Sequence, residues 1–360
     1  MVVYLLYFIF LTILAIQYEF IPFKNNYLVI AVLFLLALLA GLRGIDVSRD
    51  YYNYRYIFEN VYDLTGDGLN YLTIFEPGFI SIIIFFRTIF EYNYVVAIML
   101  FYAFSSLLLK IYAINRLSIN PYLSILFYFS YYFLVQEMTQ IRIGLASGIF
   151  LISLIPFLKG KRITFTCLIL LATLFHYSAI FYLLLLIFKT TKFNKTLYSL
   201  ALVLSVILGI VKLPLLSLLG NFDPSNLSGK LNSYIEISES GGATINVFNS
   251  LNICNILCCV YLIFFVNKEI FASDSRLVLF LKCNILSIFL LSFLAGVPTV
   301  SLRFNQLFGI TQIFLIPYLT RYLPAKRFNI LILVLLAVFF FYVTGFYGNL
   351  LHPYQLANFK

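Results

Sequence analysis

The chain has 360 residues, of which 62% are hydrophobic and only 11% are charged, and its mean hydropathy is +0.99. This composition excludes a soluble protein built around one core and indicates a protein that resides in a lipid bilayer. The formal net charge of +10 comes from Lys and Arg residues in short loops between apolar runs, which is the positive-inside pattern of a bacterial inner-membrane protein rather than a nucleic-acid-binding patch.

The apolar runs predict an all-α polytopic membrane protein. Each crossing needs about 20 apolar residues, and fewer where a cavity thins the bilayer. With broken or re-entrant helices counted, we expect roughly 11–13 transmembrane segments in one integral membrane domain over residues 1–360. The runs expected to span are 2–21, 27–42, 94–114, 122–135, 142–158, 197–211, 250–266, 277–295, 304–322 and 328–345.

Two polar stretches interrupt these runs. The first polar loop, 43–93, contains the apolar run 77–90, which gives only about 20 Å of helix and is too short for a bilayer. We interpret this run as an in-plane helix, which places the loop outside; if it spans instead, the loop is cytoplasmic. The second stretch, 213–249, is predicted to be a large extracytoplasmic loop.

The apolar run 163–188 has positive charge on both sides. A single crossing would place one of the two clusters outside, against the charge rule. The sequence therefore predicts two short half-helices that enter and return, with their turn near residues 175–178. Such a break is tolerated at membrane depth only where it lines protein or water, which suits His176 at the turn. The flanking charges are Lys159, Lys161 and Arg162 before the run, and Lys189, Lys192 and Lys195 after it.

Ionisable side chains inside apolar runs are costly in lipid and point to function. Arg142 enters one run and His176 lies at the middle of another, and we expect them to share one polar cavity with Arg43, Asp46 and Arg303. Simpler interpretations stay open. Arg142 could snorkel from a helix end, His176 could be a packed histidine, and Arg303 could mark a helix start.

The start of the first loop carries groups suited to a phosphorylated sugar. Arg43, Asp46, Asp50 and Tyr51 follow directly after an apolar run. Arginine forks bind diphosphate oxygens, and tyrosine rings stack on sugars and bond their hydroxyls. The alternative is a set of anchors at headgroup depth.

Three further residues are weaker candidates for substrate contact. Glu76 stands directly before Pro77, where it could also act as an N-cap-like acid. Glu137 and Gln140 lie in the short polar link before Arg142.

The cysteine and histidine pattern predicts neither a disulfide nor a metal centre. The five cysteines lie in apolar runs without a Cys-x-x-Cys pair, and the chain has two histidines. We therefore expect no metal and no cofactor.

Several short motifs, in this order, resemble the EpsG-like family of polysaccharide polymerases, which includes Wzy-type O-antigen and capsule polymerases. The resemblance runs from Gly41 to about Pro317. The motifs are RGID at Arg43 to Asp46 with Asp50 and Tyr51 after it, EPGF from Glu76, QIRIGLA from Gln140, LATLFHYS from Leu171 and the late Arg303.

The resemblance implies a GT-C-like membrane glycosyltransferase at the outer face of the inner membrane. Such an enzyme moves a glycan from an undecaprenyl diphosphate carrier onto the non-reducing end of a carrier-linked repeat unit, in membrane lipid, with a chain-length regulator and a flippase as further partners. It also suggests roles for residues of this chain: Arg142 and Arg303 at the diphosphate with Arg43 assisting, His176 as the first choice of base and Asp46 as the second, and Asp50, Tyr51, Glu76 and Gln140 in substrate binding.

The main alternative function is a lipid-linked oligosaccharide flippase or another membrane transporter, because intramembrane charges also line transport paths. Transporters usually show two related halves, and the sequence shows no repeat. An acyltransferase would need an acid beside its histidine, and His176 has no acidic neighbour in sequence.

Overall fold

The computed structural model describes residues 1–22, 26–65, 75–211, 245–325 and 328–357. These residues form an all-α structure, with one isolated bridge between Arg43 and Leu356. Among them, five helices are long and apolar enough to cross a membrane, and six apolar helices are shorter. The expectation of an all-α polytopic membrane protein is therefore confirmed.

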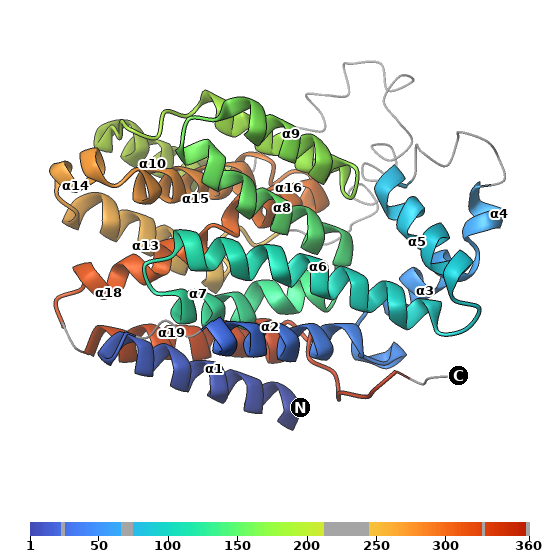
Figure 1. Cartoon of the computed structure of the whole chain (residues 1–360). Coiled ribbons are helices and arrows are strands. Elements are labelled where there is room, and N and C mark those ends of the chain that lie inside the picture. The colour runs from blue at the N-terminus through green and yellow to red at the C-terminus, as the bar shows by residue number, and fades with distance from the viewer. Residues whose placement is uncertain (23–25, 66–74, 212–244, 326–327, 358–360) are drawn as a thin grey trace, which may run out of the picture. The chain divides into compact units, whose positions relative to one another are not determined.

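The chain divides into two compact units. The first comprises Met1–Leu186 and Leu323–Lys360, and the second Ile187–Tyr322. In the first unit, α2 packs on α6, α6 on α8 and α8 on α9, while α1 packs on α7 (Figure 1). These helices are α1 (Val2–Phe20), α2 (Asn26–Gly41), α6 (Tyr94–Leu117), α7 (Pro121–Phe127), α8 (Ile141–Leu158) and α9 (Arg162–Thr173).

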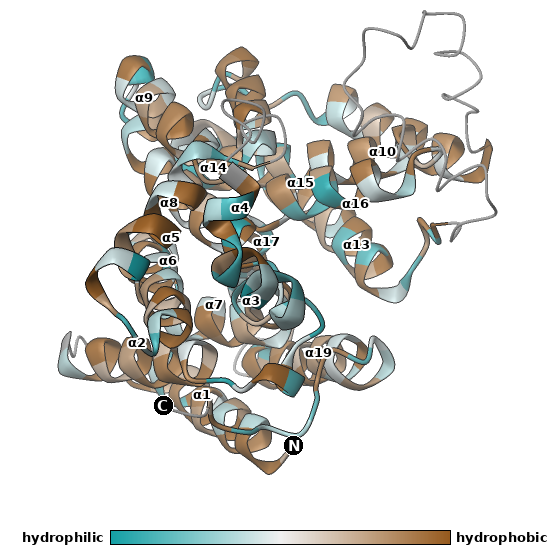
Figure 2. Cartoon of the chain, turned by 90° about the vertical axis from the view of Figure 1, so that its right-hand side faces the viewer, coloured by the Kyte–Doolittle hydropathy of each residue, from teal (hydrophilic) through white to brown (hydrophobic). Residues whose placement is uncertain are grey.

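The first polar loop contains more helix than the sequence indicates. It holds η1 (Ile45–Val47), α3 (Tyr51–Glu59), α4 (Val61–Thr65) and α5 (Pro77–Ile89). In α3 the buried residues Tyr51, Tyr54 and Phe58 recur at helical spacing, so the helix has one apolar face. Hydrophilic residues colour much of α3 and α4, whereas α1 and α2 are largely apolar (Figure 2).

The helix before the predicted link 136–140 continues further than expected. Asn120 caps α7 by accepting from the backbone N–H of Leu123 at 3.0 Å, and Pro121 occupies the first turn. The chain then widens into a π-helix, η3 (Tyr128–Glu137). Gln136 and Glu137 are therefore buried helical residues, and π-helical turns often mark functional sites.

The run 163–188 forms the two half-helices that its flanking charges predict. α9 ends at Thr173 and a 3₁₀-helix, η4 (Tyr177–Ile187), follows. Arg162, at the start of α9, donates through Nη1 to the carbonyl oxygen of Leu186 at 3.5 Å. Because the two ends meet, the two half-helices form a hairpin with His176 in its turn, and its entry into the membrane from one side stays a prediction.

The second unit is built around α15, which packs on α10, α13 and α16. Asp274 caps α15 by accepting from the backbone N–H groups of Arg276 and Leu277. α16 starts at Pro298 rather than at residue 304, because proline favours the first helical turn, so Arg303 lies inside the helix and not before it. The elements are α10 (Lys195–Val211), α13 (Ser250–Phe265), α14 (Lys268–Ser273), α15 (Ser275–Phe293), α16 (Pro298–Gly309), α17 (Gln312–Leu315), η6 (Ile316–Tyr318) and α18 (Leu319–Tyr322).

The C-terminal segment returns to the first unit. After α19 (Asn329–Tyr342) and η8 (Val343–Tyr347), the chain runs beside the residues that follow α2. The backbone N–H of Gly44 donates to the carbonyl of Gln355 at 2.7 Å, and that of Ala357 donates to the carbonyl of Leu42 at 2.9 Å. The predicted loop 213–249 lies mostly outside the described residues.

Candidate active site around Glu76, Arg142 and His176

A buried carboxylate joins the two ionisable residues that stand out in the apolar runs. Glu76 is only 3% exposed. Its Oε2 accepts from Nη1 of Arg142 at 2.5 Å, and its Oε1 lies 3.3 Å from Nδ1 of His176. Oε1 also accepts from the backbone N–H of Tyr177 at 3.3 Å. Glu76 therefore binds a guanidinium on one oxygen and an imidazole on the other.

The local sequence explains how Glu76 reaches the hairpin turn. Pro77 starts α5, and Glu76 occupies the N-cap position without a side-chain cap bond. The backbone N–H of Gly78 donates to the carbonyl of Leu174 at 2.9 Å, where a Cβ would stand only 2.8 Å from that oxygen. Glycine is thus required for this close approach. Tyr177 closes the contact by donating to the carbonyl of Phe75 at 2.9 Å.

Arg142 is held in place but remains partly open. It is the second residue of α8, and its side chain keeps 25% exposure. Its guanidinium carbon lies 4.9 Å from the ring centre of Phe79, and the group also interacts with the side chain of Tyr54. Asp50 interacts with the same positive charge. A fixed guanidinium that uses only part of its five N–H donors on protein groups can still bind an anion.

The pKa values of the Glu76 and Asp50 carboxyl groups are shifted in opposite directions. Burial alone would raise the pKa of Glu76, but the hydrogen bond from His176 and the positive charge of Arg142 outweigh it and hold the pKa at about 2. Burial raises the pKa of Asp50, although Arg142, Arg49 and Arg43 oppose this shift. Glu76 is therefore ionised at neutral pH and is a weak base.

Arg43 is near this centre but faces inward. It is 1% exposed and donates to the carbonyl of Ala40 and, at 3.4 Å, to Oγ of Ser48. Its guanidinium lies 5.9 Å from the ring centre of Tyr51. Through these contacts Arg43 stabilises the start of the first loop. Its role at the diphosphate stays a prediction.

The other predicted residues are distributed around this centre. Asp46 is exposed, accepts from the hydroxyl of Tyr52 at 3.1 Å, and lines a hollow of about 510 Å³ together with Tyr51. Gln140 directly precedes α8, and its buried Oε1 has no hydrogen-bond partner among the described residues. Arg303 is half-buried in α16 of the second unit, so its expected meeting with Arg142 stays a prediction.

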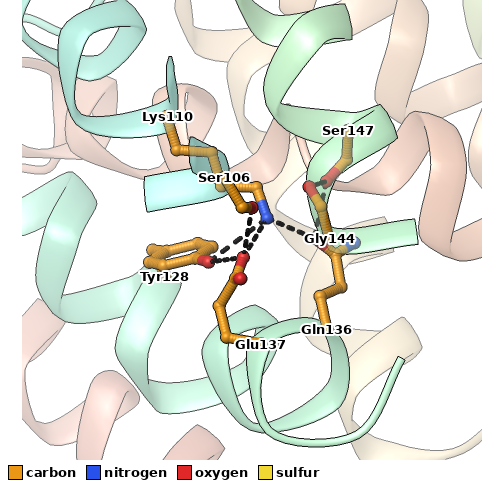
Figure 3. Close-up of polar contacts among 7 residues, drawn as sticks. All are labelled: Ser106, Lys110, Tyr128, Gln136, Glu137, Gly144 and Ser147. Carbon is orange, nitrogen blue, oxygen red and sulfur yellow. Dashed lines mark hydrogen bonds and ion pairs between the residues drawn. The ribbon is translucent and has the colours of Figure 1, made fainter. Parts of the chain in front are cut away.

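A second polar cluster, between α6, η3 and α8, is completely buried (Figure 3). Nζ of Lys110 lies 2.5 Å from Oε1 of Glu137, and the hydroxyls of Ser106 and Tyr128 donate to the same oxygen at 2.7 and 2.6 Å. Lys110 also donates to Oε1 of Gln136 at 3.0 Å. The cluster ties the π-helix to α6, four residues before α8 begins.

Gly144 brings α8 into this cluster. A Cβ on Gly144 would stand 3.2 Å from Oε2 of Glu137. Ser147, one turn later, donates to Oε1 of Gln136 at 2.8 Å. The start of α8, which carries Arg142, is therefore packed directly on the buried carboxylate.

Sequence reasoning missed Lys110, Tyr54 and Phe79. Lys110 lies inside the predicted span 94–114, and a charge at that depth was the signal that could have singled it out. Tyr54 and Phe79 gave no such signal, because aromatic residues are ordinary at membrane interfaces. The described residues hold no group of three or more His, Cys, Asp or Glu side chains that could bind a metal ion.

Comparison with known proteins gives one match. No curated protein and no solved structure is significantly similar to this chain. The family model described as the EpsG family matches residues 26–356, which include the Glu76, Arg142 and His176 centre and nearly the whole chain. The chain therefore belongs to the EpsG family, a Wzy-like polymerase-type family.

Proposed function

We propose that this multi-pass membrane protein is a glycosyltransferase that polymerises polysaccharide repeat units. It would transfer a glycan from an undecaprenyl diphosphate carrier onto a carrier-linked acceptor sugar at the outer face of the bacterial inner membrane. Membership of the EpsG family supports a role in membrane polysaccharide biosynthesis. The observation that carries the finer proposal is a partly exposed Arg142, fixed by a buried Glu76 that also holds His176.

Arg142 suits the donor side of this reaction. The bond between the anomeric carbon and the carrier phosphate oxygen breaks, and negative charge grows on the diphosphate. A guanidinium held by Glu76 and packed on Phe79 can stabilise that charge without reorganising. The planar fork of arginine also matches phosphate oxygens better than an ammonium group does.

His176 suits the acceptor side. Because a carboxylate only accepts hydrogen bonds, Glu76 makes Nδ1 of His176 the donor and leaves the lone pair on Nε2. Nε2 can then take the proton of the acceptor hydroxyl as its oxygen bonds to the anomeric carbon. Glu76, with a pKa of about 2, orients the histidine and is too weak a base to replace it. Asp46 remains the second choice of base.

The proposal is tested in a strain that lacks the native gene and carries the chain on a plasmid. We expect Arg142→Ala to lower polymer at least about 100-fold, while single repeat units accumulate on the carrier, because removal of one oxyanion-type donor costs that much. Arg142→Lys should not restore the polymer, since lysine lacks the fork. His176→Gln should lower turnover at an unchanged protein level. The readouts are polysaccharide ladders on gels and mass spectrometry of extracted lipid-linked sugars.

Arg116→Ala is the matched control, because Arg116 is exposed at the end of α6, and it should keep normal ladders. Normal ladders in Arg142→Ala would overturn the proposal. A null strain that accumulates its repeat units only on the cytoplasmic leaflet would favour the flippase instead.

A further inference from the structure

The first unit contains a hollow whose lining does not include Glu76, Arg142 or His176. Its volume is about 510 Å³, within the range of ordinary ligand pockets. η1, α3, the turn before α6 and the C-terminal segment form its walls. The residues that the argument needs are Asp46, Tyr51, Glu59, Glu91, Tyr92 and Tyr94.

The lining is aromatic and acidic. Tyr92 is 64% exposed, so an aromatic ring stands open to a ligand instead of packing in the protein. Arg55, the one arginine among the lining residues, is paired with Glu59 at 2.6 Å, and the lining also holds the carboxylates of Asp46 and Glu91, so its acidic side chains outnumber its basic one. Such a surface repels phosphates and anionic headgroups.

A neutral sugar fits this lining. Sugar rings present apolar faces to tyrosine rings, and their hydroxyls donate to carboxylates and to tyrosine oxygens. An amino sugar would gain further from the acidic groups, whereas a uronic acid would be repelled. The chemistry therefore selects a neutral or amino-sugar glycan over a lipid headgroup.

The hollow lies beside the candidate active site. Tyr51, in its wall, is the first residue of α3. Asp50, one residue before it, and Tyr54, one turn after it, both interact with Arg142. One helical turn, about 5.4 Å along the axis, therefore separates groups of the hollow from groups that face Arg142.

The C-terminal segment forms one wall of the hollow and is held there by hydrogen bonds. Gln355, Leu356 and Ala357 line it, and backbone hydrogen bonds of 2.7 and 2.9 Å tie this segment to the residues after α2. A Cβ on Gly44 would stand 3.1 Å from the carbonyl oxygen of Leu356, so glycine permits the tail to close this wall.

We infer that this hollow is a glycan subsite that binds neutral or amino-sugar residues of the carrier-linked substrate next to the reacting sugar. The inference rests on the proposed function for its place in the reaction, but sugar binding there can be measured without polymerisation. Loss of the subsite should raise KM and leave kcat largely unchanged, because the sugars that it binds do not react.

The test uses the purified full-length protein in detergent. The probe is a set of carrier-free oligosaccharides, made by partial acid hydrolysis of the polysaccharide that the strain itself produces, and binding is measured by calorimetry and saturation-transfer NMR. We expect Tyr92→Ala and Glu91→Gln each to raise Kd about tenfold or more, because the first removes a stacked ring and the second a charged hydrogen-bond acceptor. Tyr56→Ala is the control, because Tyr56 is an exposed tyrosine of α3 outside the hollow.

Arg142→Ala separates the two claims. It should lose polymerisation if the proposed function holds, and it should bind the oligosaccharides like the wild type if the subsite inference holds. No binding by the wild type, or equal Kd values for Tyr92→Ala, Glu91→Gln and Tyr56→Ala, would overturn the subsite. Matching helix content by circular dichroism excludes misfolding as the cause of a loss.

Discussion

Glu76 has to be ionised in a place that excludes most water. Burial of a lone carboxylate costs several kcal/mol, and the cost is met only when partners neutralise the charge and satisfy its oxygens. Arg142, His176 and the backbone N–H of Tyr177 supply those partners. The same contacts fix the direction of the guanidinium and the tautomer of the imidazole. Glu76 thus orients both Arg142, at the donor diphosphate of the proposed reaction, and His176, at the acceptor hydroxyl.

This pairing predicts a pH dependence of stability. The pKa of Glu76 in the fold is about 2, below its ordinary value of 4.5, so the ionised form stabilises the fold. The contribution, on the order of 3 kcal/mol, is complete above pH 4.5 and is lost as the pH falls toward 2. In detergent, we expect Glu76→Gln to lower Tm at pH 7 and to flatten the decline of Tm between pH 4.5 and 2.5, followed by circular dichroism at 222 nm. Glu269→Gln, an exposed site, should keep the wild-type decline, and an equally steep decline in Glu76→Gln would refute the assignment.

Single residues of the site could be predicted, but their pairing could not. Arg142 and His176 stood out because a charge or an imidazole in an apolar run is costly. Glu76 and Arg142 are 66 residues apart, and no local pattern indicates that they meet. The burial of Arg43 and its bonds to backbone and serine oxygens had no signal in the sequence, and its assisting role at the diphosphate stays a prediction.

At the level of elements, the buried Lys110 and Glu137 pair holds the π-helix against α6 beside the start of α8 (Figure 3). A buried pair of this kind adds little to the free energy of unfolding compared with apolar packing. Removal of one partner, however, leaves a buried charge unpaired and lowers the free energy of unfolding by about 3–5 kcal/mol. The pair instead fixes the positions of η3, α6 and α8 relative to one another. Glu137 accepts three hydrogen bonds on one oxygen and packs against Gly144 of α8.

A double-mutant cycle tests whether Lys110 and Glu137 hold these helices together as a pair. We expect Lys110→Met and Glu137→Gln each to lower Tm by many degrees, and the double variant to recover most of the loss, because no unpaired charge remains. If the pair also positions Arg142, the double variant should fold yet make less polymer, with a lower kcat and a nearly unchanged KM. Additive losses of Tm would mean that the two residues do not depend on each other. Ser153→Ala, at a buried hydroxyl of α8 outside the cluster, serves as the packing control.

The bounds of a helix could be predicted where flanking charges or the length of an apolar run determine them. The hairpin of α9 and η4 followed from Lys and Arg on both of its sides. The π-helix did not, because its extension through Gln136 and Glu137 depends on Lys110, Ser106 and Ser147 in other helices. Pro298 was a local signal for the start of α16, whereas the apolar run placed the predicted start at residue 304.

At the scale of the whole molecule, the orientation of α8 relates the site to the membrane. The helix has 18 residues, about 27 Å, with Arg142 near one end and the basic turn of Lys159, Lys161 and Arg162 at the other. Since basic turns usually stay in the cytoplasm, we expect the Arg142 end to face outward. α9, of 12 residues or about 18 Å, starts from that turn and brings His176 toward Arg142 before η4 returns. Arg142 and Arg303 belong to different units, so their joint action stays a prediction.

This geometry predicts which side of the membrane each loop occupies. In a variant whose cysteines are replaced by serine, Asn53→Cys on the exposed side of α3 should react with an impermeant maleimide in intact spheroplasts. Lys161→Cys, exposed in the basic turn, should react only after lysis. α3 carries Tyr54 and follows Asp50, both partners of Arg142, so labelling at residue 53 reports the side on which transfer takes place. If Asn53→Cys were protected and Lys161→Cys labelled, the site would face the cytoplasm, where the polymer could not be released outside, and transfer at the outer face would be refuted.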